Sequence, residues 1–575
     1  MRYLSALTLI TLFSCTKPVP PAQPEAPVTI TIVAMNDFHG AIHSQTPRGQ
    51  DDMRMGGLPW LVGAVEAIRA ESPDMVLLDG GDVFQGDWEV NATEGRGAVD
   101  ALNMLGLDAA AVGNHDFDYG PLEDGDPENL RGALEAGAKR SNFQWLSANI
   151  ENSDGSVWAP EGIAPWTIIE RKGKRIGVIG LSTQDTPQTT LLRNVADLAF
   201  TDIVETVQEL LPVIHAEGVD AMVLVAHLTG SCEPEGYFEV GAPCTPDDEI
   251  GRLLNELPVG TFDVMVLGHA HTIMAHRVGD TFLMEQRAKG HALGQLELVF
   301  GPDGVDADAS HIREPWPLLH TQADPGCEEG EYDMTPQAIG PRTVTPNAEA
   351  VALVDALEEE AGSMCQALGC ADHYLGRTRT AESEAGNFMA DAMLSHFPQA
   401  DFAIQNSGGV RANLPEGVVR RGSLQAMMPF DNRVFLVEMT GEQVNELFRL
   451  GSSGAHGILQ VAGANYHFDP EQTGGSDLDG DGETADWETN RLCSVSVADA
   501  PVSDEATYKI VTTDFLFDGG DHLGHVFEHT TLLEEGPLLR EVLYSATSSL
   551  GDECIGAAGP LVNPEAPRIA QGTCE

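Results

Sequence analysis

The stretch Leu107-Asp-Ala-Ala-Ala-Val112, followed directly by Gly113-Asn114-His115-Asp116-Phe117-Asp118, decides how the first half of the chain is interpreted. The apolar run predicts a strand, and polar side chains begin where that strand ends. Asn114 offers a neutral oxygen, His115 can exchange a proton near neutral pH, and Asp118 can orient the imidazole. Loops are also built from Asn, Asp and Gly, so this stretch alone is equally typical of an ordinary turn.

Four further apolar runs are followed at once by side chains that can bind a metal ion. They are Val28 to Met35 before Asp37-Phe38-His39, Asp74 to Leu78 before Asp79-Gly80-Gly81-Asp82, Asp220 to Ala226 before His227, and Phe262 to Leu267 before Gly268-His269-Ala270-His271. Ligands bind at the carboxyl ends of strands in open α/β sheets. A single such residue is more often an ordinary turn or surface group, but five strands with the same arrangement predict one common site.

Helical patterns alternate with these strands. Gly57 to Ala70, Val99 to Leu105 and Phe200 to His215 have the spacing of amphipathic helices. Arg175 to Leu181 predicts another strand, and the loop 182–186 after it contains no His and is expected to have a structural role. Strands that alternate with helices indicate an α/β layered domain.

Length and charge limit the classes of protein that fit. At 575 residues the chain is too long for one core, and two large domains are expected. Hydrophobic residues at 42% and charged residues at 21% are typical of a globular protein, whereas a formal net charge of -58 is unusually acidic. Such a surface repels polymeric nucleic acid and anionic membranes. An anionic substrate would therefore need a locally positive site.

The first residues predict export. Arg2 and the apolar run Tyr3 to Phe13 are typical of a signal peptide, assigned to residues 1–14. Leu12-Phe13-Ser14-Cys15 resembles a bacterial lipoprotein box, which implies lipidation of Cys15 and a Pro-rich tether over residues 15–27. The alternative is an ordinary secreted protein cleaved nearby. No Asp follows Cys15 directly, which favours an outer-membrane location, facing the periplasm or the cell surface, by analogy with lipoprotein sorting.

The cysteines agree with an oxidising compartment. An even number, eight of the nine, follow Cys15, which suggests disulfides. Proximity in the sequence is the only guide to their pairing, and it gives Cys232 with Cys244, Cys365 with Cys370, Cys554 with Cys574, and Cys327 with Cys493. A cysteine zinc site is disfavoured because the sequence contains no Cys-x-x-Cys pair.

The remaining chain divides into a first domain over residues 28–330, a linker over 331–370 and a second domain over 371–575. The run Asn347 to Leu368 predicts one acidic helix in the linker. The second domain contains arginines, glycine-rich turns and two phenylalanines in Arg377-Thr378-Arg379, Asn406 to Arg411, Pro429-Phe430 and Asp514 to Asp521. These groups suit a flat base and a phosphate, although core phenylalanines and solvated arginines are the simpler interpretation when this domain is taken alone.

Taken together, these motifs resemble the calcineurin-like metallophosphoesterases and, over nearly all of the chain after the tether, the bacterial exported 5′-nucleotidase and UDP-sugar hydrolase family. The family order of Asp-x-His, Gly-Asp, Gly-Asn-His-Asp, a lone His and Gly-His-x-His is present. The resemblance implies an α/β fold: an N-terminal metallophosphoesterase layered β-sandwich flanked by helices, a linker helix and a C-terminal α/β substrate-binding domain.

The resemblance also implies a dinuclear metal centre and a catalytic pair. Two divalent ions of Mn, Zn, Fe or Co are expected about 3.5–4 Å apart. His115, paired with Asp118, would stabilise charge or protonate the leaving group, while Asp116 and His43 receive no catalytic role. The implied ligands are Asp37, His39 and His271 for the first ion, Asn114, His227 and His269 for the second, and Asp82 as the bridge.

In the second domain the resemblance implies a substrate clamp. Arg379, Asn406 and Arg411 would bind phosphate and polar groups, Phe430 and Phe515 would sandwich the base, and Asp521 would bind the ribose hydroxyls. Because the clamp and the metals lie on different domains, the resemblance further implies a domain rotation, with substrate held in the closed form.

One motif lies outside the resemblance. The stretch 477–488 fits the calcium-loop pattern, with Gly482 at the sharp turn. No helix is predicted before it, so it would be an isolated calcium loop, and an acidic turn is the alternative. The expected Ca²⁺ ligands are Asp477, Asp479, Asp481, Glu483 and Glu488.

The sequence therefore predicts an exported phosphohydrolase that cleaves the phosphomonoester of 5′-nucleotides, a small-molecule substrate, by metal-activated hydroxide. No obligate protein partner is expected. The alternatives are a UDP-sugar hydrolase or a 2′,3′-cyclic-nucleotide phosphodiesterase with 3′-nucleotidase activity. A third alternative, from another class, is a calcium-dependent surface binding protein with vestigial catalysis. The complete set of metal and dyad residues argues against that alternative.

Overall fold

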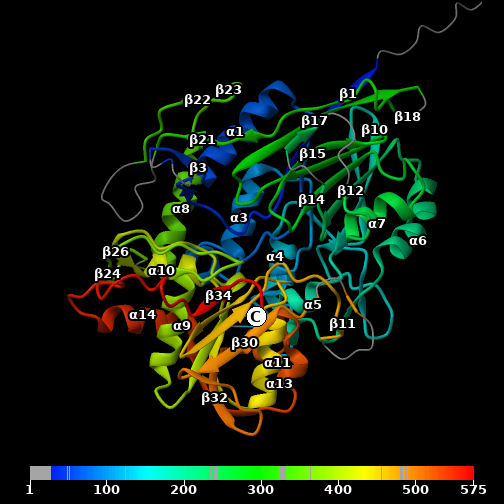
Figure 1. The fold of residues 1–575 in the computed structure, drawn as a ribbon. Helices are drawn as coiled ribbons and strands as arrows, with labels where there is room; N and C mark the ends of the chain where they lie inside the picture. Colours follow the sequence, from blue (N-terminus) through cyan, green and yellow to red (C-terminus); the bar gives the residue numbers. More distant parts are fainter. Residues whose placement is uncertain are drawn as a thin grey trace, which may run out of the picture.

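The N-terminal half of the chain forms two packed β-sheets, and the C-terminal half forms a second α/β unit, shown in yellow to red in Figure 1. The expected signal peptide, Cys15 and Cys327 lie outside the part of the chain that the structure describes. Within that part, no helix is both long and apolar enough to cross a membrane. The structure is a computed structural model, and it describes residues 27–47, 50, 52–122, 125–232, 236–238, 244–302, 304–322, 332–362, 364–454, 456–478, 484–485 and 488–574.

The first sheet carries three of the five expected strands. Its parallel centre is β1 (Val28–Met35), β4 (Val76–Asp79) and β5 (Ala109–Ala111), and β17 (Ala292–Gly301) runs antiparallel to β1. The second sheet carries the other two. Its parallel centre is β10 (Lys174–Ser182), β12 (Ala221–His227) and β14 (Val264–Gly268).

Apolar side chains fill the space between the two sheets, and they also cover the outer face of each sheet. Ile32 and Val76 from the first sheet pack with Val223 and Val266 from the second in one buried cluster. The strands are therefore apolar on both faces, as their near-continuous hydrophobic runs require. The outer faces are covered by α1 (Leu58–Glu71) and α3 (Arg96–Leu105) on one side, and by α6 (Ile203–Ala216) and α7 (Glu249–Glu256) on the other.

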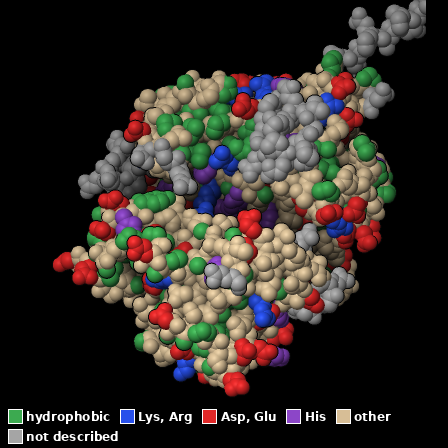
Figure 2. Space-filling view, in the orientation of Figure 1, with side chains coloured by type: hydrophobic (Ala, Val, Ile, Leu, Met, Phe, Trp, Pro, Cys, Tyr) green, Lys and Arg blue, Asp and Glu red, His purple; other side chains and the backbone are tan. Residues whose placement is uncertain are grey.

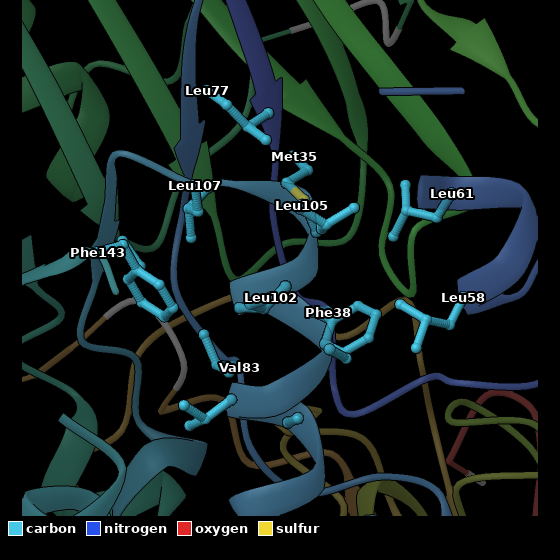
Figure 3. Close-up of a cluster of buried hydrophobic side chains, with 14 of the residues drawn as sticks. Met35, Phe38, Leu58, Leu61, Leu77, Val83, Leu102, Leu105, Leu107 and Phe143 are labelled. Carbon is cyan, nitrogen blue, oxygen red and sulfur yellow. The ribbon is translucent and has the colours of Figure 1, made fainter. Parts of the chain in front are cut away.

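Figure 3 shows the helix-covered face of the first sheet. Leu102 and Leu105 of α3 lie beside Met35 and Phe38, and all four side chains are buried. Each fully buried side chain of this kind contributes about 1.5–3 kcal/mol. The cluster lies directly behind the loop that follows β1, so it fixes the position of the first predicted ligands.

The linker helix α8 (Ala348–Ala361) begins where the sequence predicts and ends earlier than predicted. The Asn347 side chain accepts hydrogen bonds from the backbone N–H groups of Glu349 and Ala350. The helix stops at Ala361, before Gly362 with its φ of 74°, and not at Leu368. Residues 367–371 form a strand instead, because they pair with a second strand of the C-terminal domain.

The C-terminal domain is built on a five-stranded sheet. Helices α9 (Glu384–His396) and α14 (Leu539–Ser549) pack together on one face, and α11 (Gly441–Gly451) covers the other face. In spatial order the strands are β28 (Leu459–Ala462), β25 (Phe402–Asn406), β32 (Thr507–Thr513), β27 (Arg433–Thr440) and β33 (Thr531–Leu538).

Shorter elements complete the fold and position the site. The short helices are α2 (Trp88–Ala92), α4 (Gly132–Arg140), α5 (Thr186–Thr189), α10 (Arg421–Met427), α12 (Asp514–Phe517), η4 (Gly520–His522) and α13 (Gly524–Phe527). The short strands next to the disulfides of the C-terminal domain are β24 (Ala367–Ala371), β29 (Ala464–Phe468), β30 (Leu492–Val497) and β34 (Ile569–Gln571).

The disulfides confirm one predicted pair and correct the others. Cys232 is bonded to Cys244, as predicted. The predicted bonds Cys365–Cys370, Cys554–Cys574 and Cys327–Cys493 are wrong, because the structure pairs Cys370 with Cys554 and Cys493 with Cys574. Strand pairing explains the error. Ala371 bridges Ile555, and β29 lies between β30 and β34, so cysteines 184 and 81 residues apart become neighbours.

Candidate active site

The five predicted ligand loops meet at one place, although their strands belong to two sheets. The loops after β1, β4 and β5 leave the first sheet, and those after β12 and β14 leave the second. A single sheet edge, as the sequence suggested, is therefore not the correct description. The carboxyl ends of two packed sheets converge, and this brings more ligands together than one sheet edge would.

Sharp turns aim the ligands inward. Asp37, His39, Asp82, His269 and His271 all have positive φ values, between 47° and 92°. Residues other than glycine rarely adopt this conformation, and it persists only where the surroundings impose it. The strain indicates that the turns serve the positions of these side chains.

The first group of ligand atoms consists of Asp37, His39 and His271. The Nε2 atom of His271 lies 3.0 Å from Oδ1 of Asp37 and 3.2 Å from Nε2 of His39. Asp37 is fully buried, and the pKa of its carboxyl is lowered despite that burial, chiefly by His271. A carboxylate and two imidazole nitrogens therefore point at one small volume.

The second group consists of Asn114, His227 and His269. The Oδ1 atom of Asn114 lies 3.1 Å from Nε2 of His227 and 3.1 Å from Nδ1 of His269. Asp82 stands between the two groups, with Oδ2 3.0 Å from Nε2 of His227 and 3.7 Å from Nε2 of His39. Its position is that of a bridging carboxylate.

Hydrogen bonds to the backbone fix which imidazole nitrogen is available. Nδ1 of His39 lies 3.1 Å from the carbonyl oxygen of Gln85, and Nδ1 of His227 lies 3.1 Å from that of Gly80. A carbonyl can only accept, so each Nδ1 donates, which leaves each Nε2 as the nitrogen that would bind a metal ion. Both Nε2 atoms face Asp82.

Burial and neighbouring charges shift the pKa values of two ligand histidines in opposite directions. Burial, followed by the charge of His227, lowers the pKa of His269 to about 3. Burial also disfavours charge on His227, but Asp82 outweighs it and raises the pKa of His227 to about 10. Carboxylate, amide oxygen and imidazole without thiolate suit divalent transition ions. The residues therefore fit the two divalent ions that the fold implies.

Asp116 has a structural position. Its carboxylate accepts hydrogen bonds from the backbone N–H groups of Phe84 and Gly113, at 2.9 and 2.8 Å, and so ties together two of the ligand loops. Burial, and then Asp82, raise its pKa to about 8. Gly113 is required here, because a Cβ atom would lie 2.1 Å from Oδ1 of Asp82.

The predicted pair His115 and Asp118 is formed. Nδ1 of His115 lies 2.6 Å from Oδ2 of Asp118, and Thr190 donates a hydrogen bond to Oδ1 of the same carboxylate at 2.8 Å. The backbone N–H of His115 donates to Oδ1 of Asp82 at 2.9 Å. The imidazole is therefore oriented from two sides beside the ligand cluster. Thr190 was not expected, because a lone Thr in a loop carries no sequence signature.

A cavity of about 390 Å³ joins this cluster to the second domain. Figure 2 shows a hollow between the two halves of the molecule in which histidines and basic side chains gather. All six predicted clamp residues line the cavity together with Asp82, Asn114, His115, Asp118, His269 and His271, and they are Arg379, Asn406, Arg411, Phe430, Phe515 and Asp521.

The cavity carries a cluster of arginines. Burial, followed by the charges of Arg379 and Arg377, lowers the pKa of Arg411 to about 10. Burial and Arg379 also lower the pKa of Arg377. Neighbouring cations that repel one another at the wall of a cavity form a binding site for an anion. Arg377 lies in the predicted basic stretch, but the sequence did not distinguish it from solvated arginines.

One aromatic clamp residue, Phe430, lies near His115. The ring of Phe430 is 5.9 Å from that of His115, and the Arg411 guanidinium is 5.6 Å from the Phe430 ring centre. Asn406 donates a hydrogen bond to Asp521 at 2.8 Å. The amide of Asn91, in the N-terminal domain, donates to the carbonyl of Pro429 at 2.8 Å. The two domains are therefore in direct contact beside the cavity.

The structure also bears on His43 and on part of the expected calcium loop. His43 forms an ion pair with the buried Glu89, 3.0 Å away, and takes no part in the ligand cluster.

In the expected calcium loop, Asp479, Asp481 and Glu483 lie outside the described residues. The Glu488 carboxylate accepts hydrogen bonds from the backbone N–H groups of Leu478 and Ala485, which closes the loop through its own backbone.

The fold and the site together define a two-domain metallophosphoesterase. Comparison with known proteins agrees. The calcineurin-like phosphoesterase family matches residues 30–272, and the 5′-nucleotidase C-terminal domain matches residues 363–529. The chain therefore belongs to the family of hydrolases that joins these two domains.

Individual relatives are distant. The trifunctional nucleotide phosphoesterase protein YfkN of Bacillus subtilis is 26% identical over 86% of this chain, and the probable 5′-nucleotidase of Treponema pallidum is 25% identical over 86% of both chains. The chain spans 32% of the length of YfkN and 64% of that of the cell wall protein Lmo0130 of Listeria monocytogenes. The crystal structure of a 5′-nucleotidase precursor from Thermus thermophilus covers 95% of this chain and 99% of its own, with a TM-score of 0.73 and 24% identity.

Proposed function

We propose that the protein hydrolyses the phosphomonoester of 5′-nucleotides to nucleoside and phosphate. One observation carries this proposal: a single cavity is lined by four of the seven expected metal ligands, by three arginines and by Phe430 and Phe515. A phosphate needs the first two groups, and a flat base needs the third. The relatives named as 5′-nucleotidases favour the same substrate class.

The ligand cluster would hold two divalent ions. Asp37, His39 and His271 would bind one ion, Asn114, His227 and His269 the other, and Asp82 both. When bound, such a pair supplies activation of water and charge stabilisation on the phosphoryl oxygens. The Nε2 atoms of His39 and His227 already face Asp82, which supports this assignment.

The remaining site residues would bind and orient the nucleotide. His115, held by Asp118, is placed to donate a proton to the leaving oxygen or to stabilise the charge that develops on the phosphate. Arg379, Arg411 and the additional Arg377 would bind the phosphate, since all three line the cavity and their charges act on one another. Asn406 and Asp521 would bind the sugar.

The experiment that tests this function measures phosphate release from 5′-AMP by the full chain with Mn²⁺, with and without a chelator. Release that is lost on chelation and in His115→Ala supports the proposal. If 3′-AMP, a 2′,3′-cyclic nucleotide or a UDP-sugar is cleaved instead, the proposed metal centre is retained but the proposed substrate is wrong. The relative named as a trifunctional nucleotide phosphoesterase is the reason to test these substrates. No release from any of them, by folded and metal-loaded protein, would favour a binding protein.

We also propose that the protein is exported and anchored by a lipid on Cys15, with residues 28–330, 331–370 and 371–575 as its first domain, linker and second domain. The disulfides support export, since such bonds persist in oxidising compartments. Metabolic labelling with a radioactive fatty acid, lost in Cys15→Ser, tests the anchor. Unchanged labelling in that variant would overturn it.

A Ca²⁺ ion in the loop 477–488 stays a separate proposal. Its support is the pattern of acidic residues in the sequence. Calorimetry with Ca²⁺ on the full chain and on Glu488→Gln tests it. Equal heats in both proteins would overturn it.

A further inference from the structure

Two histidines and a carboxylate meet where the domains touch, apart from the ligand cluster described above. Asp185 precedes α5 in the N-terminal domain, whereas His456 and His522 belong to the C-terminal domain. One ligand atom from each of the three lies within 4.8 Å of the other two. The rings of His456 and His522 stack with their centroids 5.0 Å apart. The three side chains are thus gathered by the contact between α5 and η4.

The local backbone holds these groups in place. Asp521 and His522 have successive positive φ values of 54° and 62°, which interrupts the helical conformation of η4. Two adjacent residues other than glycine keep this conformation only where the surroundings impose it. Asp185 occupies the position that usually caps a helix, but its side chain makes no capping hydrogen bond to α5.

The protonation states suit a metal ion. Burial raises the pKa of Asp185 to about 6, with His456 lowering it and Glu249 and Asp521 raising it. Burial, and then His456, lower the pKa of His522 to about 4. At neutral pH the carboxyl is ionised and the imidazole is neutral, and these are the forms that bind metals.

We propose that Asp185, His456 and His522 form a third cation site, which takes a divalent transition ion of the Zn²⁺ class and links the two domains. Two imidazoles and one carboxylate are a usual zinc ligand set, with a fourth position left for water. Ca²⁺ and Mg²⁺ fit poorly, because they select oxygen ligands. Donors on one tetrahedral Zn²⁺ lie about 3.3 Å apart. The three ligand atoms, which lie within 4.8 Å of one another, would move closer to that spacing on binding.

Binding at this site has a consequence for the domain arrangement. The ion needs a ligand from each domain, so it stabilises the closed arrangement in which Phe430 approaches His115. His456 also lines the substrate cavity, and His522 follows Asp521 directly. An ion here therefore slows the separation of the domains and lengthens the stay of nucleotide or product in the cavity.

The first test is a count of bound metal on the full chain. The chain is equilibrated with Zn²⁺ in excess Mg²⁺, which occupies exposed carboxylates, and is then analysed for zinc. We expect three ions in the unmodified protein and in His529→Gln, an exposed histidine of the same segment. His522→Gln and Asp185→Asn should each bind two, because loss of a ligand weakens a site by roughly 10–100-fold or more. Two ions in the unmodified protein, or three in both variants, would overturn the proposal.

The second test uses unfolding, which does not depend on catalysis. With the other metal sites saturated by Mn²⁺, added Zn²⁺ should raise the unfolding temperature of the unmodified protein and of His529→Gln. It should leave His522→Gln and Asp185→Asn unchanged. An equal rise in all four proteins would contradict the site. Neither test measures phosphate release, so failure of the proposed nucleotidase activity would leave these results standing, and the reverse also holds.

Discussion

The proposed metal centre and the proposed nucleotide clamp face the same cavity, but they are built differently. The ligands of the metal centre follow strands directly, are mostly buried and are held by strained turns and backbone hydrogen bonds. Most clamp residues come from loops and short helices, although Asn406 ends β25, and several remain partly exposed. Substitutions in the first region should therefore abolish catalysis, whereas those in the second should mainly weaken substrate binding.

The largest effect is expected from Asp82→Asn. This change removes the carboxylate that lies between both ligand groups and that also accepts the N–H of His115. The rate of phosphate release should fall beyond the roughly 10²–10⁴-fold that loss of one proton-transfer group costs. Elemental analysis should show fewer than two active-site ions, while the exposed Asp154→Asn control keeps both. If the variant keeps both ions and a rate near that of the unmodified protein, Asp82 does not bridge the two ions.

The next effect is expected from His115→Gln. The imidazole is oriented by Asp118 but is not placed among the ligands, so kcat should fall by roughly 10²–10⁴-fold with metal content unchanged. Steady-state kinetics and metal analysis together check this, with the exposed His311→Gln as control. A variant that loses metal instead would assign His115 to the metal centre.

A smaller effect, on KM, is expected from Arg377→Ala. A charged hydrogen bond contributes about 1.5–3 kcal/mol, so KM should rise by about 10–100-fold while kcat changes less. Arg433→Ala, on the exposed end of β27, should leave both constants unchanged. A fall in kcat at unchanged KM would place Arg377 in the chemical step and remove the distinction between the two regions.

The smallest effect concerns stability and acid. Burial, and then Lys289 and Arg287, lower the pKa of His291 to about 3, so the folded state keeps it neutral. In the unfolded chain the imidazole binds a proton near pH 6.5. The contribution of His291 to the free energy of unfolding is therefore complete above that pH and is lost as the pH falls towards 3. Between pH 7 and 5 the loss is roughly 2 kcal/mol. His291→Gln should lose that much less in urea unfolding. Identical losses would show that His291 is protonated in the fold.

The difference between the regions also explains what could be predicted from the sequence. The proposed metal ligands lie in short motifs immediately after apolar strands, so the proximity of residues such as Asp37 and His227 could be predicted without knowledge of how the sheets pack. Arg377 and Thr190 could not, because their roles depend on contacts between segments far apart in the chain. The same reason explains the wrong disulfides, since Cys370 meets Cys554 only after the C-terminal domain has folded.

The loop 182–186 shows this limit most clearly. It contains no His, so only a structural role was expected for it. Folding places its Asp185 beside His456 and His522 of the other domain. A site shared between two domains leaves no local pattern in either segment.

The central claim is that phosphate release depends on two divalent ions held beside a nucleotide clamp. The most direct test strips the full chain of metal and titrates it with Mn²⁺ while phosphate release from 5′-AMP is followed. The account predicts no release without metal, and full activity only when the second active-site equivalent is bound. Release by the stripped protein, or full activity after one equivalent, would contradict it.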